Sequence, residues 1–170
     1  MPEIQTFLRD WERWTADLLE SHISYPQVAY FRSQHGRQSW VSALTVVLDA
    51  SALVLTGIEG IPSWRARQAF AMARHAAVDL CQVLNVQPRK SPRLDSPQDD
   101  RILAAVESTG LQLIDRADAA GRLLRYRKMY EPYVAGLSAA LAMDLPNWIR
   151  DAGARDNWET TPRTEWEQHL

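Results

Sequence analysis

The sequence predicts an all-α fold, a single-domain helical bundle of about six helices with no sheet. Apolar residues recur three or four positions apart almost throughout the 170 residues, which is the period of an amphipathic helix. No stretch alternates apolar and polar residues over the length of a strand, and no Asn-Gly hairpin signal is present. A chain of this length is typical of one domain with its own core.

The first helix is expected over residues 3–22, where one face is apolar. That face carries Phe7, Trp11, Trp14 and Leu18. Pro26 then restarts the chain, because the residue before a proline avoids the α region and a proline suits the first turn of a helix. A short second helix is expected over residues 28–33, with Val28, Tyr30 and Phe31 as core anchors.

The third helix, expected over residues 38–56 after Gly36, is apolar nearly all round. It approaches the length of a membrane span, but Asp49 lies at its middle, so we interpret it as a buried helix of a core. Its polar residues share one narrow stripe: Ser42, Thr45, Asp49 and Thr56. A carboxylate in such a helix requires a partner, because an unpaired buried charge costs several kcal/mol.

The fourth helix, expected over residues 63–84 after a turn at Gly57, Gly60 and Pro62, is amphipathic. If it forms an antiparallel hairpin with the third helix, Asp49 lies level with Arg74 and His75. Pairing of Asp49 with either residue is therefore predicted. A structural ion pair is the favoured interpretation, and a ligand-binding or proton-sensing role is the alternative.

Residues 86–100 contain three prolines and six charges, which predicts an exposed Pro-rich loop. Ser96 and Pro97 are typical of an N-cap and first helical position, so a fifth helix is expected from there to residue 108. A long helical pattern over residues 112–143 is expected to be interrupted or kinked at Pro132.

Residues 145–149 are expected to close the packed part of the chain. The resulting domain organisation is a helical bundle over residues 1–150 and a polar C-terminal tail over residues 151–170.

Motifs for enzymatic chemistry are missing from the sequence. There is no Gly-x-Ser-x-Gly elbow, no Gly-rich phosphate loop and no Glu-x-x-His motif. Cys81 falls on the apolar half of its helix, where a thiol stays protonated and inert. His75 and Asp79 have the i, i+4 spacing of a metal pair, but a solvated helix face explains them without a metal. We expect no enzyme, no cofactor, and no catalytic, cofactor-binding or metal residues.

Charge and cysteine content limit which partners and which cellular compartment are expected. With 19 Lys and Arg against 21 Asp and Glu, the net charge of -2 gives no reason to expect nucleic acid. A single cysteine suits a reducing cytoplasm. The N-terminal stretch MPEIQTFLRDWERW has no apolar signal-peptide core, so no signal peptide is expected. No direct membrane insertion by the chain is expected either.

Five residues are candidates for a ligand or interface site between helices. They are Arg32, His35, Asp49, Arg74 and His75. The polar cluster from residue 32 to 37 sits at the mouth of the third helix, which favours a docking or sensing surface over an active site. Histidine is the side chain whose ordinary pKa lies near neutral pH, so His35 and His75 are the candidates for a pH response.

Three segments carry a family resemblance: residues 21–55 (SHISYPQVAYFRSQHGRQSWVSALTVVLDASALVL), 66–80 (ARQAFAMARHAAVDL) and 130–148 (YEPYVAGLSAALAMDLPNW). They resemble the cytoplasmic helical region that follows the two-helix pore in a family of bacterial potassium-channel proteins, over roughly residues 5 to 150. The resemblance implies a cytosolic domain that assists assembly or biases a gate. This chain lacks a Thr-Val-Gly-Tyr-Gly filter and a pair of spanning helices, so it is either an excised domain or a freestanding relative.

The resemblance transfers no catalytic or ligand residue. It leads us to expect a non-enzymatic regulatory or assembly domain of a potassium-channel-like membrane protein, acting through oligomerisation or gating at the cytosolic face of the inner membrane. The expected partners are further copies of the chain and a pore in the same full-length chain. A small-molecule, ion or pH sensor domain is the alternative hypothesis, and a small helical enzyme is the third and less favoured hypothesis.

Overall fold

The computed structural model describes residues 2–31, 39–95 and 98–149. These residues form seven α-helices and one 3-10 helix, with only an isolated bridge between Ile58 and Leu113 in place of a sheet. The all-α bundle predicted from the sequence is therefore confirmed. The expected count of about six helices omitted the shortest one, α4 (Pro92–Asp95).

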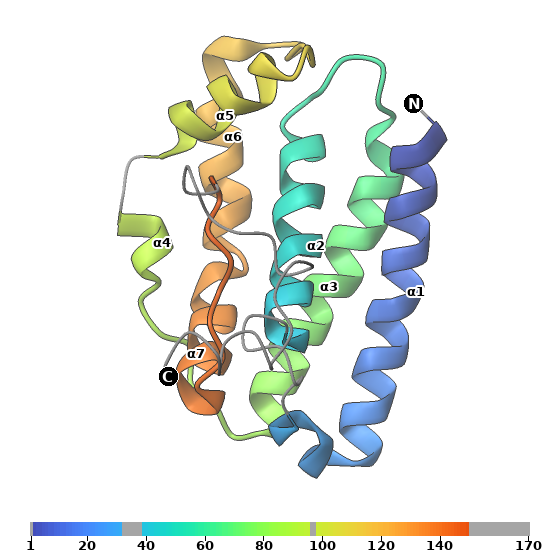
Figure 1. The fold of residues 1–170 in the computed structure, drawn as a ribbon, viewed down its shortest axis with the longest axis vertical. Helices are drawn as coiled ribbons and strands as arrows, with labels where there is room; N and C mark the ends of the chain where they lie inside the picture. The colour runs from blue at the N-terminus through green and yellow to red at the C-terminus, as the bar shows by residue number, and fades with distance from the viewer. Residues whose placement is uncertain (1, 32–38, 96–97, 150–170) are drawn as a thin grey trace, which may run out of the picture.

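Long helices lie side by side along the longest axis of the molecule (Figure 1). From right to left they are α1 (Pro2–Ser24), α3 (Ser63–Val83), α2 (Trp40–Leu55) and α6 (Arg116–Lys128). Below α6 the chain continues in α7 (Glu131–Leu141). The two smaller helices α4 and α5 (Asp99–Ser108) cover the outer side of α6, on the left of Figure 1. Helix α3 packs most extensively, against both α1 and α2.

Small side chains on α3 explain its central place. Ala73, Ala76 and Ala77 are fully buried, and alanine allows the axes of neighbouring helices to approach closely. Leu44 and Leu48 of α2 are also fully buried in the same core. The core is therefore built from leucine and valine side chains of α2 packed against an alanine-rich face of α3.

The helix ends follow local chemistry. The hydroxyl of Ser39 accepts a hydrogen bond from the backbone N–H of Ser42 at 3.1 Å and caps α2. Pro132 lies in the first turn of α7, where a missing N–H costs nothing. The expected interruption at Pro132 is confirmed as a break between α6 and α7. Ser96 and Pro97, expected to open α5, lie outside the described residues.

The second helix is shorter than expected and differently packed. It is a 3-10 helix, η1 (Pro26–Tyr30), and of its residues Ala29 is the buried one. Tyr30 and Phe31 are 62% and 72% exposed, so the expectation that they anchor the core is wrong. Their place is taken by Trp40, whose indole N–H donates to the carbonyl of Ala29 at 3.0 Å and ties η1 to α2.

The Pro-rich segment 86–100 is exposed in part only. Val86 to Lys90 are mostly exposed, but Ser91 is fully buried and the Arg93 side chain is 10% exposed. The prediction of an exposed loop is wrong for these two residues, because buried carboxylates of other helices hold them. The backbone N–H of Arg89 also donates to the carbonyl of Pro132 at 2.9 Å, which fastens the segment to α7.

Gly136 marks the closest approach between this segment and α7. A Cβ at residue 136 would lie 2.5 Å from the carbonyl oxygen of Gln87, which is backbone and cannot step aside cheaply. Gly121, in the exposed face of α6, would place a Cβ against the ends of the Asp118 and Arg125 side chains only. Glycine is therefore required at residue 136 by the close approach of Gln87, whereas residue 121 has room for a side chain.

Substituting each glycine by alanine tests this difference between the two positions. Gly136→Ala is expected to lower the free energy of unfolding by about 1–3 kcal/mol, because the methyl group overpacks the contact with Gln87. Gly121→Ala is expected to raise it by up to about 1 kcal/mol, because glycine weakens a helix interior. Urea unfolding followed by circular dichroism measures both, and equal effects would contradict the close approach at residue 136.

Candidate functional site

A buried network of polar side chains joins α2, α4, α5, α6 and α7. We call it the polar network, and its members are Asp49, Ser91, Arg93, Asp99, Arg127, Tyr130 and Glu131. Arg127, Tyr130 and Glu131 are fully buried. Charged side chains are seldom buried to this degree unless they pair with one another.

Asp49 is the centre of the network on α2. Its Oδ2 accepts a hydrogen bond from Nη2 of Arg93 at 2.5 Å, and its Oδ1 accepts one from the hydroxyl of Tyr130. Burial raises the pKa of Asp49 to about 6, against the opposing effects of Arg93 and the Tyr130 hydroxyl. At neutral pH the carboxylate is therefore ionised, and both of its oxygens are engaged.

Glu131 is the second buried carboxylate. It accepts hydrogen bonds from the Ser91 hydroxyl at 2.7 Å and from the Trp148 indole N–H at 3.4 Å. Nη1 of Arg93 and Nε of Arg127 lie 3.6 and 3.5 Å from its Oε1. Glu131 thus lies between the two guanidinium groups and compensates both.

Arg127 completes the network toward α5. Its Nη1 donates to Oδ1 of Asp99 at 2.6 Å, and its Nη2 donates to the backbone carbonyl of Arg93. The ring of Trp148 lies 5.2 and 5.3 Å from the guanidinium carbons of Arg127 and Arg93, within cation–π range. One side chain therefore connects α6 to both α4 and α5.

The polar network acts as a clamp, because its ion pairs and hydrogen bonds hold neighbouring helices together. Burial raises the pKa of Tyr130 well above its ordinary value, so its hydroxyl stays protonated and serves as a donor. Burial disfavours a charged Arg93, but Asp49 and Glu131 raise the pKa of its guanidinium above the ordinary value. Two arginines and three carboxylates thus bind one another and hold α2, α4, α5, α6 and α7 together.

The predicted partners of Asp49 are wrong. Arg74 donates through Nε to the backbone carbonyl of Met129 at 3.2 Å, and His75 lies 3.2 Å from Asp79 on its own helix. Asp49 instead points toward α4 and α7, whose residues come more than forty positions later in the chain. The remaining hydroxyls of the predicted polar stripe on α2 mostly bond to the backbone of their own helix.

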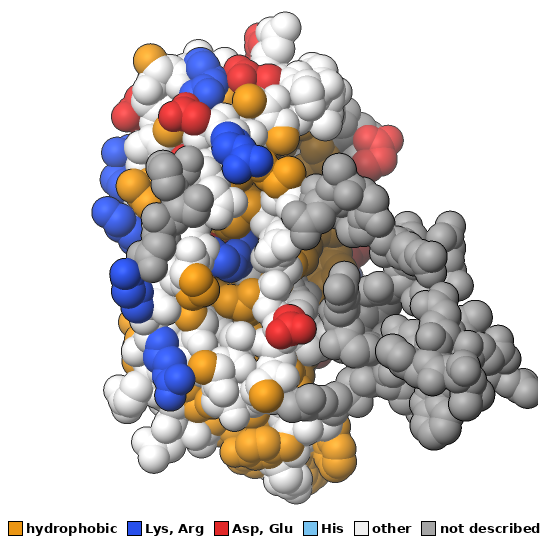
Figure 2. All heavy atoms as spheres, turned by 60° about the vertical axis from the view of Figure 1, so that its left-hand side comes forward, with side chains coloured by type: hydrophobic (Ala, Val, Ile, Leu, Met, Phe, Trp, Pro, Cys, Tyr) orange, Lys and Arg blue, Asp and Glu red, His pale blue; other side chains and the backbone are white. Residues whose placement is uncertain are grey.

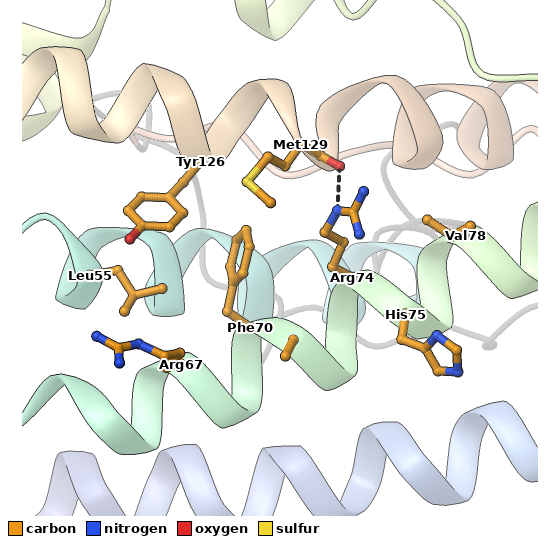
Figure 3. A pocket seen from close by; sticks show the side chains of 9 residues that line it. Leu55, Arg67, Phe70, Arg74, His75, Val78, Tyr126 and Met129 are labelled. Atoms are coloured by element: carbon orange, nitrogen blue, oxygen red, sulfur yellow. Dashed lines mark hydrogen bonds between the residues drawn. The ribbon is translucent and has the colours of Figure 1, made fainter.

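A separate open groove lies between α3 and the end of α6 (Figure 3). It has a volume of about 530 Å³. It is lined by Leu55, Arg67, Phe70, Ala71, Arg74, His75, Val78, Tyr126 and Met129. The rings of Phe70 and Tyr126 meet edge to face with centroids 5.3 Å apart, which gives the groove an apolar floor.

A second groove continues the first along α3. It has a volume of about 400 Å³ and shares Val78 with the first groove. Its lining is Val78, Cys81, Gln82, Asn85, Val86, Gln87, Pro88 and Tyr133. Burial raises the pKa of Cys81 to about 11, so the thiol is protonated at neutral pH, as the sequence predicted.

The candidate residues therefore divide between two places. Arg74 and His75 line the first groove, whereas Asp49 belongs to the polar network. Arg32 and His35 lie outside the described residues. Sequence reasoning missed the network's other charged members, although one signal was available. Arg127 and Glu131 fall at helical spacing among Leu123 and Val134, where an exposed charge is not expected.

Three further findings concern metal ligands, membrane spans and relatives of the chain. Among the described residues no group of three His, Cys, Asp or Glu side chains could hold a metal ion. No helix in the described ranges combines the length and hydropathy needed to cross a membrane. No family model matches the chain, and comparisons with curated proteins and with solved structures found no match.

Removing Arg93 is expected to destabilise the fold strongly. Arg93→Met keeps most of the side-chain volume but leaves Asp49 and Glu131 without their shared cation, which costs about 3–5 kcal/mol for a buried pair. Arg101→Met on the exposed face of α5 is the control and is expected to change stability by no more than about 0.5 kcal/mol. Urea unfolding measures both; equal losses would show that the network does not clamp α4.

Proposed function

We propose that the chain is a non-enzymatic regulatory or assembly domain that acts through contacts between helical surfaces. The observation that carries this proposal is a set of four large exposed side chains, close together in the sequence, where α1 meets η1. We call it the aromatic corner: Ile23, Tyr25, Tyr30 and Phe31, exposed by 49%, 61%, 62% and 72%. Exposed apolar groups gathered in one place are typical of interaction sites.

Buried contacts of Ala29 and Trp40 hold the aromatic corner in place. Ala29 is fully buried, and its carbonyl accepts the Trp40 indole N–H. The Trp40 ring in turn packs edge to face on buried His22, with centroids 4.8 Å apart. Tyr30 and Phe31 follow this anchored residue directly, so they are presented on a fixed base, which favours a specific contact.

The ionisable side chains of the polar network are already engaged with one another, which supports the same proposal. The carboxylates and arginines of the polar network bind one another, and the Cys81 thiol is kept protonated. Neither groove is lined by a member of the network. Such an arrangement favours a stable scaffold that binds its partner through an exposed apolar surface.

Association with a potassium-channel-like membrane protein is part of the proposal. It rests on the resemblance of three segments, and the aromatic corner falls inside the first of them, residues 21–55. We propose that the corner binds a second copy of the chain on the cytosolic side of the membrane. In a full-length protein, such contacts between copies would assist the assembly of a pore or bias its gate.

Self-association through the aromatic corner is tested with two equally exposed residues. Phe31→Ser is expected to weaken association by about tenfold or more, because a buried aromatic contributes about 1.5–3 kcal/mol to a contact. Ile114→Ser, also 72% exposed but in the connection between α5 and α6, is the control and should change nothing. Sedimentation velocity at micromolar concentration is the measurement. A monomer at every concentration, or an equal effect of both variants, would sink the proposal.

A second candidate function is pH sensing, and the polar network favours it. Asp49 on α2 faces Arg93 on α4 together with Tyr130 and Glu131 at the start of α7. Protonation of this carboxyl removes the charge that pairs with Arg93 but also relieves the cost of burying that charge, so the contact between α4 and α2 would change with pH. Because the network connects five helices, a change at Asp49 acts on contacts of α2, α4 and α7 directly and on those of α5 and α6 through Arg93 and Arg127.

The pH dependence of stability tests this alternative. The pKa of Asp49 is about 6 in the folded chain and 3.8 ordinarily, so between these values the folded state binds more protons than the unfolded state. The contribution of Asp49 to stability is therefore present below pH 4 and is lost as the pH rises to 6. The difference of about 2 pH units corresponds to about 3 kcal/mol at most.

The comparison is between the wild-type chain and Asp49→Asn, unfolded in urea at several pH values from 4 to 7. The stability of the wild type should fall relative to the variant as the pH rises across this range. A difference that is flat with pH, or that rises, would mean that Arg93 keeps Asp49 ionised throughout and would remove the basis for pH sensing.

A further inference from the structure

The two grooves along α3 form one elongated concavity, which we call the α3 groove. They meet at Val78, and their lining on α3 runs from Arg67 to Gln82. A separation of fifteen residues corresponds to about 22 Å along a helix axis. The concavity is therefore longer than a site for a compact small molecule and has the length of about four helical turns.

The floor of the α3 groove is apolar. Leu55 comes from the end of α2, Phe70 and Val78 from α3, and Tyr126 and Met129 from the end of α6 (Figure 3). The Met129 side chain is 42% exposed although it lies in a concave part of the surface. An apolar floor of this kind is typical of grooves that receive the apolar face of an amphipathic helix.

Two arginines on α3 stand beside this floor without a carboxylate partner among the described residues. Arg67 is exposed, and Arg74 makes a hydrogen bond to the carbonyl of Met129 and no salt bridge. They are seven residues apart on α3, which is two helical turns or about 10.5 Å. His75 adds a third basic group, although it is already paired with Asp79.

The charges that line the α3 groove are positive, because Arg67 and Arg74 belong to its lining and no Asp or Glu among the described residues does. Figure 2, which brings the side of α4 to α6 forward, shows Lys and Arg side chains in a column along its left edge, with most Asp and Glu side chains of that face toward its upper end. The two arginines of the lining favour an anionic partner.

We propose that the α3 groove binds an acidic amphipathic helix of a partner protein. An apolar stripe of that helix would pack on Phe70, Val78 and Met129. Two carboxylates seven residues apart on the partner have the same two-turn spacing as Arg67 and Arg74. The other half of the groove presents the uncharged Gln82, Asn85 and Gln87, so the acidic residues of the partner belong to one half of its helix.

The length of the groove and the spacing of the arginines distinguish this partner from a small anion. Figure 3 shows the Arg67 and Arg74 side chains extending away from each other, so in this arrangement a carboxylate or phosphate group that meets one guanidinium does not meet the other. The proposal also goes beyond the assembly function, because the aromatic corner lies at the junction of α1 and η1 and shares no residue with the α3 groove. One surface would join copies of the chain, and the other would receive a different protein.

The probe is a fluorescein-labelled synthetic helix of about eighteen residues with a leucine stripe at i, i+3, i+4 and i+7. One version carries glutamates beside the stripe in one half, and a companion carries lysines at the same positions. Fluorescence anisotropy with the full chain is expected to give a micromolar dissociation constant for the acidic peptide and a value at least tenfold weaker for the basic one. Equal affinities, or no binding at millimolar concentration, would overturn the proposal.

Charge reversal on α3 locates the site. Arg67→Glu changes an exposed residue with no carboxylate partner among those described, and it should weaken the acidic peptide by about tenfold and strengthen the basic one. Arg67→Glu combined with Arg74→Glu should abolish binding of the acidic peptide, with circular dichroism as the check on folding. Arg101→Glu on α5 is the matched control and should leave both affinities within twofold.

Other occupants of the α3 groove give different results. If Arg67→Glu alters sedimentation of the chain alone, the groove holds a second copy, and the proposal is wrong. If the wild type binds vesicles containing phosphatidylserine, loses this binding in Arg67→Glu and ignores both peptides, the occupant is a membrane surface and the proposal is again wrong. Phe31→Ser should bind the acidic peptide like the wild type, so failure of the assembly function and failure of this proposal are distinguishable.

Discussion

The pairing of Asp49 with Arg93 is the interaction on which this side of the bundle depends. Asp49 is the only charged residue of α2, and α2 is otherwise the most apolar helix of the fold. A carboxylate there destabilises the fold unless a cation reaches it, and the cation comes from a segment whose composition favours solvent. The four residues of α4 make no stable helix alone, so their position follows from this ion pair and from the burial of Ser91 beside Glu131.

The carboxylates of the polar network are closed off, whereas the grooves on the other side of α6 are open. Each carboxylate of the network accepts a hydrogen bond from another member, Glu131 also accepts one from the Trp148 indole N–H, and the Trp148 ring lies against both guanidinium groups. On the opposite side of α6, the helix end meets α3 mainly through the rings of Tyr126 and Phe70 and the hydrogen bond from Arg74. The α3 groove exists because this contact is narrow and none of the described helices covers it.

Sequence reasoning reached the fold because the helical period is a local property. The spacing of Phe7, Trp11 and Leu18 is sufficient to predict α1, and Pro132 is sufficient to predict a break. The partner of Asp49 is not local, because Arg93 lies forty-four residues away and is surrounded by prolines that are typical of a loop. The need for a partner could be predicted from α2 alone, whereas its identity depended on how α4 folds back on the bundle.

The junction between α6 and α7 is where the polar network and the α3 groove meet. The carbonyl of Met129 accepts the hydrogen bond of Arg74 at the groove, and the next residue, Tyr130, donates its hydroxyl to Asp49 inside the network. Helix α6 ends there because Pro132 must begin a new helix, and the ending exposes the carbonyl that Arg74 uses. A carboxylate that drew Arg74 away from Met129 would therefore act one residue from the clamp that holds α2, α4 and α7 together. The break that Pro132 imposes is thus a structural requirement of both sites.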